Sequence, residues 1–147
     1  KSLKEFYKKH NDNWTIPLVL EGSFKIKIGN YWLVGRIDRI DKNEKNELEI
    51  IDYKTGKGKE KLDASDKDQL LLYQIASSTL PQYKNLGEVK RLVYYYLDND
   101  LMETEFLGSD KEIEKFKYKI IEAIEGIISG NFDGPCKNFK CDFCHLK

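Results

Sequence analysis

The chain lacks the features that mark a membrane protein, a secreted scaffold or an ATPase. It has 3 prolines in 147 residues and no Pro/Gly-rich linker. Its longest apolar runs, such as Leu70–Leu72, are far shorter than the roughly 20 residues of a membrane-spanning helix. The opening Lys-Ser-Leu-Lys-Glu has no secretory or transit pattern, and no Walker-type phosphate loop is present. We therefore expect a cytoplasmic protein with no membrane partner.

The chain also lacks a net charge, since 25 basic residues balance 25 acidic ones. An overall positive charge therefore cannot be used to argue for nucleic-acid binding, and any basic patch must be local. The composition is 40% hydrophobic, 12% aromatic and 34% charged, which is typical of a folded domain. The length suits a single domain over 1–147.

Hydrophobic periodicity predicts a mixed α/β domain with the element order α-β-β-β-α-β-β-α. Pro81 is expected to end the second helix, and Ser65 with Asp68 and Ser109 with Glu112 are expected to form capping boxes at two helix starts. The expected helices cover 1–9, 65–80 and 109–130, and the expected strands cover 18–28, 31–41, 47–54, 89–97 and 101–107.

Three carboxylates are predicted to share one level of a three-stranded antiparallel meander. A two-residue turn at 29–30 places Glu21 opposite Asp38, and a second turn centred on Lys45 places Asp38 opposite Asp52. Like charges that face one another in a sheet repel. The arrangement therefore favours a hard divalent cation with oxygen ligands, and a solvated acidic face is the alternative.

Lys54 lies two residues beyond Asp52, so it shares that face of the strand. A lysine beside metal-binding carboxylates can stabilise the negative charge that develops on a reacting phosphate. The alternative is an ordinary surface ion pair with Asp52, which contributes little energy.

Three motifs in sequence resemble the PD-(D/E)XK nuclease superfamily. They are Gly-Arg-Ile-Asp-Arg-Ile-Asp at 35–41, Ile-Ile-Asp-Tyr-Lys-Thr-Gly at 50–56 and Gln-Leu-Leu-Leu-Tyr at 69–73. The combination is similar to the RecB-like branch, which includes CRISPR-associated RecB-like nucleases and the nuclease domains of UvrD-type helicases. The resemblance extends over roughly residues 1–144. It implies a restriction-endonuclease-like α/β fold, a mixed sheet flanked by helices.

The resemblance also implies roles for individual residues. Mg²⁺ or Mn²⁺ would be held by Glu21, Asp38 and Asp52, and Lys54 would act on the phosphate. Gln69 and Tyr73, one helical turn apart, would pack beside the site, although core packing is the alternative for Tyr73. The catalytic set that the resemblance implies is Asp38, Asp52, Lys54, Glu21, Gln69 and Tyr73.

Two departures from the family pattern suggest that the chain is a fragment of a longer protein. The family's histidine comes from a helix well upstream, so we expect an N-terminal helix to be missing and His10 to be a surface residue. Many relatives carry a four-cysteine 4Fe-4S cluster, whereas the tail at 131–147 has three cysteines, with iron–sulfur, zinc and free thiols as the open alternatives. These cysteines are Cys136, Cys141 and Cys144. A fourth ligand could be His145, or it could come from before Lys1 or after Lys147 in a full-length protein.

Local positive charge is the remaining signal for DNA. Arg36 flanks Asp38, and a Gly/Lys-rich loop follows Lys54 and is expected to reach a phosphate backbone, unless its lysines are merely solvated. The predicted DNA-binding residues are Arg36, Lys57, Lys59 and Lys61.

These features together predict a metal-dependent DNA nuclease, the C-terminal nuclease domain of a DNA-repair helicase. Its partners would be single-stranded DNA or DNA ends, and a helicase domain in the same parent chain or in another subunit. Two alternatives stay open. One is a catalytically weak binding or interaction module on a nuclease fold, and the other is a stand-alone restriction-type nuclease or CRISPR-adaptation exonuclease.

Overall fold

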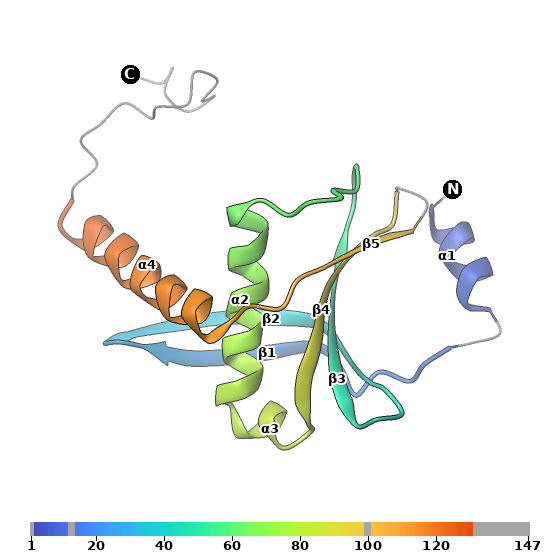
Figure 1. Cartoon of the computed structure of the whole chain (residues 1–147), viewed down its shortest axis with the longest axis horizontal. Helices are drawn as coiled ribbons and strands as arrows, with labels where there is room; N and C mark the ends of the chain where they lie inside the picture. The colour runs from blue at the N-terminus through green and yellow to red at the C-terminus, as the bar shows by residue number, and fades with distance from the viewer. Residues whose placement is uncertain (1, 12–13, 99–100, 131–147) are drawn as a thin grey trace.

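A computed structural model describes residues 2–11, 14–98 and 101–130 (Figure 1). The described ranges contain four helices and five strands in the expected order, with one short helix added. The helices are α1 (Ser2–His10), α2 (Ala64–Thr79), α3 (Pro81–Lys84) and α4 (Asp110–Ile128), and the strands are β1 (Val19–Ile28), β2 (Tyr31–Lys42), β3 (Glu47–Lys54), β4 (Glu88–Tyr96) and β5 (Met102–Glu105).

The five strands form one mixed sheet in the order β1-β2-β3-β4-β5. The β1–β2 and β2–β3 pairs are antiparallel, β3 and β4 are parallel, and β4 and β5 are antiparallel. Ile28 pairs with Tyr31 across the first turn, and Ile40 pairs with Ile50 across the second. Both predicted hairpin registers and the restriction-endonuclease-like fold class are therefore confirmed.

Helices cover both faces of this sheet. On one face the Tyr73 hydroxyl of α2 reaches Asp52 of β3, and Phe116 of α4 joins the buried core. On the other face the Phe6 ring of α1 lies 6.1 Å from the ring of Tyr53. Since successive residues of a strand point to opposite faces, β3 presents Asp52 to α2 and Tyr53 to α1. In Figure 1 the β1–β2 hairpin runs crosswise to β3 and β4, behind α2.

Three local predictions need correction. Asp63, rather than Ser65, caps α2, and it forms the capping box with Asp66. Pro81 does end α2, but it also starts α3, because its fixed φ suits the first position of a helix. The last strand is shorter than predicted, since β5 covers Met102–Glu105 only. The Ser109–Glu112 capping box of α4 is confirmed.

We expect Asp63→Ala to lower the melting temperature by a few degrees, because it leaves the N–H of Asp66 without its side-chain acceptor. Ser65→Ala is the matched control in the first turn of the same helix, and it should leave the melting temperature within about one degree. Differential scanning fluorimetry measures both. Equal shifts for the two variants would contradict the observed cap.

Candidate active site

Asp52 lies at the centre of the candidate site and is 2% exposed. Its Oδ1 accepts hydrogen bonds from Nε2 of Gln69 and from the hydroxyl of Tyr73, both at 2.9 Å. Gln69 also donates to the Tyr73 hydroxyl at 2.7 Å. The i, i+4 spacing on α2 therefore places both side chains on one carboxylate oxygen, and Tyr73 is both buried and hydrogen-bonded to the site.

Lys54 points toward Asp52, as predicted. Its ammonium lies 2.7 Å from Oδ2 of Asp52, donates to Oε1 of Gln69 at 2.9 Å, and lies 4.7 Å from the ring centroid of Tyr94. The Tyr94 hydroxyl in turn donates to the same Gln69 oxygen at 3.0 Å. The Lys54 side chain is 33% exposed. Asp52, Gln69 and Tyr94 therefore contact the amine on its buried side, and its other side remains open to solvent.

Asp38 joins this pair where the β2–β3 ladder ends. The last ladder pair is Arg39 with Ile51, and beyond it Oδ2 of Asp38 accepts the backbone N–H of Tyr53 at 3.1 Å. The side chain thus replaces a backbone acceptor and is fixed next to Asp52. The negative charge of Asp38 contributes to raising the pKa of Asp52.

The electrostatics of Asp52 suit a cation. Burial raises the pKa of this carboxyl group, Lys54 opposes the rise, and the charge of Asp38 adds to it. The buried Oδ2 of Asp52 forms an ion pair with Lys54, yet no donor among the described residues meets it in hydrogen-bond geometry. Two carboxylates with a buried, incompletely satisfied oxygen fit the hard oxygen ligands that Mg²⁺ or Mn²⁺ prefers.

Glu21 does not join the two aspartates. The residues on either side keep the predicted register, Leu20 with Arg39 and Gly22 with Ile37, but Glu21 has a φ of 51° and no strand partner. Its carboxylate is turned to Arg36 at 3.3 Å, with 64% of the side chain exposed. Within the ranges that the structure describes, no group of three or more metal-ligating side chains occurs. The predicted three-carboxylate level therefore contains two carboxylates, Asp38 and Asp52.

A local change of face explains the departure of Glu21. Val19 and Gly22 both lie on the core side, and so do Ile37 and Ile40, although residues three apart on a regular strand point in opposite directions. Both strands therefore lose their alternation at the level of Glu21 and Asp38. Irregular backbone of this kind re-aims side chains and is frequent beside active sites.

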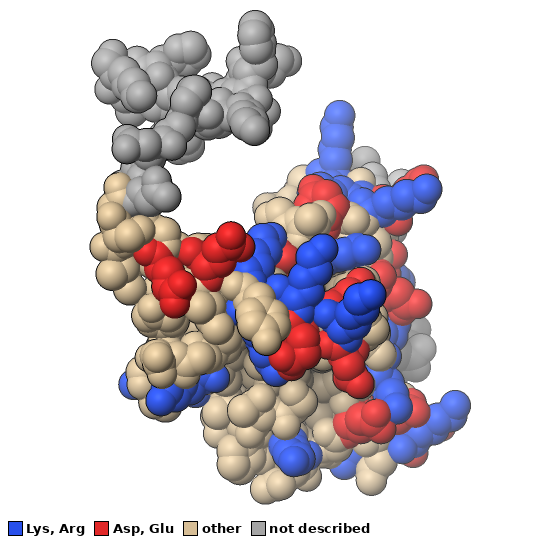
Figure 2. Space-filling model, turned by 60° about the vertical axis from the view of Figure 1, so that its left-hand side comes forward, with Lys and Arg blue, Asp and Glu red and all other residues tan. Residues whose placement is uncertain are grey.

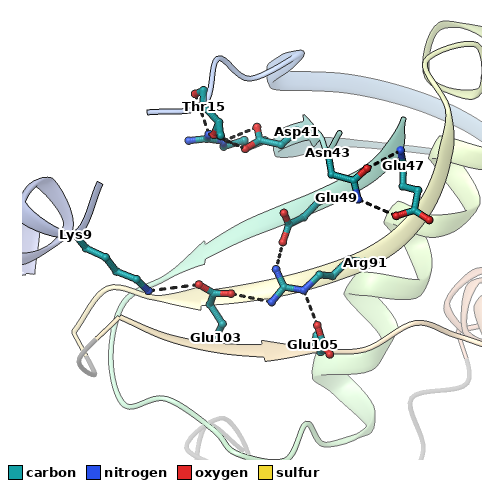
Figure 3. A network of polar contacts seen from close by, with 10 residues as sticks. Lys9, Thr15, Asp41, Asn43, Glu47, Glu49, Arg91, Glu103 and Glu105 are labelled. Carbon is teal, nitrogen blue, oxygen red and sulfur yellow. Dashed lines mark hydrogen bonds and ion pairs between the residues drawn. The ribbon is translucent and has the colours of Figure 1, made fainter. Parts of the chain in front are cut away.

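The reverse face of the sheet carries a polar network that no sequence motif indicates (Figure 3). The guanidinium of Arg39 donates twice to the buried Asp41 at 2.7 Å, and also to the Tyr53 hydroxyl at 3.2 Å and Oγ1 of Thr15 at 2.6 Å. Arg91 joins β3, β4 and β5 through three glutamates. These are Glu49, Glu103 and Glu105, and Glu103 also pairs with Lys9 of α1.

A cavity of about 200 Å³ lies between α1 and this network. His10 lines it and shares a 3.0 Å hydrogen bond with the Tyr95 hydroxyl, and burial lowers the pKa of His10. His10 is therefore partly buried, which corrects the predicted surface position. The charged side chains that line the cavity are paired with one another. We therefore interpret the cavity as part of the interface between α1 and the sheet.

The predicted DNA-binding residues lie at exposed positions but differ in their contacts. Lys57 and Lys61 are exposed, whereas Lys59 pairs with Asp63 and Asp66 at the start of α2. Arg36 is the partner of Glu21. Cys136, Cys141 and Cys144 lie outside the described residues.

The architecture and the site together define a restriction-endonuclease-like α/β domain. The PD-(D/E)XK nuclease superfamily matches residues 2–147, and the chain belongs to this family. Membership implies a nuclease, and the RecB-like branch remains a prediction. Among the described helices, none has both the length and the apolar character for crossing a membrane.

One solved structure supports the fold independently. The chain is similar to the crystal structure of SSO0001, with a TM-score of 0.54 and 21% sequence identity. The similarity covers 97% of this chain and 63% of the other, so the chain spans less than two thirds of its structural relative. A comparison with curated proteins finds no match.

Proposed function

We propose that the chain is a metal-dependent deoxyribonuclease that hydrolyses phosphodiester bonds. The observation that carries the proposal is the grouping of Asp38, Asp52 and Lys54, with Gln69 and Tyr73 bound to the central carboxylate. Family membership supports the nuclease activity, and the donor set supports the metal.

Asp38 and Asp52 would hold Mg²⁺ or Mn²⁺. When bound, such a cation would polarise a phosphoryl oxygen and would lower the pKa of a water molecule toward neutral values. Gln69 and Tyr73 bind Oδ1 of Asp52 and leave Oδ2 as the oxygen that faces Lys54. Glu21 stays a predicted third ligand, which would have to leave its ion pair with Arg36 to take part.

Lys54 would orient the attacking water and stabilise negative charge on the phosphate. The ammonium is already fixed by Asp52, Gln69 and the face of Tyr94, so little reorganisation is needed when charge develops. Its open side faces solvent, where the scissile phosphate would enter.

The RecB-like motifs support a place beside a DNA-repair helicase, in the same parent chain or a partner subunit, at DNA ends or single strands. The 4Fe-4S cluster remains part of this proposal for a full-length protein. A binding module without activity is the second candidate, but the complete Asp38, Asp52 and Lys54 set favours an enzyme over it.

The direct test is digestion of labelled single- and double-stranded DNA by the wild-type chain with Mg²⁺, Mn²⁺ or EDTA. We expect cleavage with either metal and none in EDTA. A folded chain that leaves both substrates intact in both metals would contradict the proposal.

Metal binding can be tested without DNA. We expect Mn²⁺ to raise the melting temperature of the wild-type chain by several degrees at saturation, since a ligand that binds only the folded state stabilises it. Asp52→Asn should lose this rise, because the amide cannot supply the anionic ligand. Glu49→Gln, a carboxylate on the same strand but on the reverse face, is the control that should keep it. Equal rises in wild type and Asp52→Asn would rule out the proposed ligand.

A further inference from the structure

Positive and aromatic side chains gather on one exposed face of the β1–β2 hairpin. We define the hairpin outer face as the exposed residues at three paired positions, Ser23 with Arg36, Lys25 with Val34 and Lys27 with Trp32. The face contains three cations, one indole and no carboxylate. On the side of the molecule that Figure 2 shows, positive and negative side chains are mixed.

The side chains of this face are exposed, although Arg36 already pairs with the exposed Glu21 beside it. Trp32 is 59% exposed and Val34 is 73% exposed. Among the described residues, neither Lys25 nor Lys27 forms an ion pair, and the Lys25 ammonium lies 4.9 Å from the ring centroid of Trp32. A shallow hollow lies at the Arg36 end of this face, lined by Ser23, Phe24, Lys25, Val34, Gly35, Arg36 and Gln82.

We propose that the hairpin outer face binds a single strand of DNA and guides it toward the active site. Lysines would contact the phosphates, and the indole would stack on a base. Arg36 lies two residues before Asp38 on the same strand, so the face ends close to the site, at the level where the strands lose their alternation. The inference rests on the proposed nuclease function, because it treats the bound strand as substrate.

The chemistry favours a single strand over a duplex. An exposed indole offers a π face to any unpaired base, whereas the bases of a duplex are already stacked on one another. The Lys25 ammonium over the indole makes a weak contact at an exposed site, so a base can take its place while the lysine turns to a phosphate. Cations beside an aromatic ring are the usual composition of surfaces that bind single strands without sequence preference.

The test measures binding in EDTA, so that its result does not depend on cleavage. The chain has two tryptophans, Trp14 and Trp32. Trp14→Phe leaves Trp32 as the only indole, and we expect an oligo(dT) 20-mer to quench its fluorescence. Trp32→Ala leaves Trp14, and we expect no quenching and an affinity at least about tenfold weaker by fluorescence anisotropy.

Charge variants separate phosphate contact from general electrostatics. Lys25→Glu with Lys27→Glu should make the dependence of log affinity on log salt less steep by about 1.4, which is about 0.7 for each lysine removed. Lys45→Glu with Lys84→Glu is the control with the same charge change at exposed positions off the face. The same decrease in salt dependence in the control variant would overturn the proposal.

Other results would also overturn it. These are unchanged oligo(dT) binding in Trp32→Ala, equal binding of a 20-bp duplex, or binding of anionic phospholipid vesicles in place of the oligonucleotide. The proposed function fails separately, by the absence of metal-dependent cleavage in a chain that still binds oligo(dT) in EDTA.

Discussion

Lys54→Ala is expected to lower the turnover number for metal-dependent DNA cleavage by about 10²–10³-fold, the usual loss when one preorganised charge-stabilising group is removed. The ammonium is fixed by Asp52 and Gln69 before substrate arrives, so its contribution should appear mainly in the transition state. The KM for DNA should therefore change far less than the turnover number. Single-turnover kinetics at saturating Mn²⁺ measure the chemical step directly.

Two comparisons make this result specific. Asp52→Asn should lose both cleavage and the Mn²⁺-dependent rise in melting temperature, whereas Lys54→Ala should lose cleavage and keep a rise. Lys42→Ala, an exposed lysine at the far end of β2, should cleave at the wild-type rate. Cleavage by Lys54→Ala within about threefold of wild type would exclude the assigned role.

The parts of the site that could be predicted are those fixed by local rules. A short turn sets the register of a hairpin, so counting outward from the two turns is enough to place Asp38 beside Asp52. The alternation of a strand places Lys54 on the face of Asp52, and helical spacing places Gln69 with Tyr73. Each of these inferences uses only the residues of one strand, one helix or two consecutive hairpins.

The parts that could not be predicted depend on backbone irregularity or on distant contacts. The positive φ of Glu21 breaks the alternation. The residue type does not predict this conformation, because glutamate rarely adopts a positive φ. The sequence offers two capping boxes for the start of α2, Ser65 with Asp68 and Asp63 with Asp66. The structure uses the second, in which each aspartate side chain accepts the backbone N–H of the other. Arg39 and Asp41 meet their partners Thr15 and Tyr53 only through the tertiary fold.

Arg39 also supports the largest stability prediction. The side chains of Arg39 and Asp41 are 13% and 11% exposed, and their charged groups make paired 2.7 Å hydrogen bonds. Hydrogen bonding to Asp41 raises the pKa of Arg39, which keeps it charged throughout the usual range. Removing one member of a buried pair leaves the other charge without compensation, at a cost of about 3–5 kcal/mol. We therefore expect Arg39→Ala to lower the free energy of unfolding by about that amount.

Arg36→Ala is the matched control, since it removes an arginine three residues away on the same strand whose ion pair with Glu21 is exposed. Such pairs contribute about 0–1 kcal/mol. Urea unfolding followed by circular dichroism compares the two variants. Arg39→Lys should recover only part of the loss, because an ammonium cannot make the two-pronged contact with Asp41. Equal unfolding free energies for Arg39→Ala and Arg36→Ala would show that the reverse-face network does not hold β2 against β3. In that case the position of Asp38 beside Asp52 would rest on the backbone ladder between β2 and β3 and on the hydrogen bond that Asp38 accepts from the backbone of Tyr53.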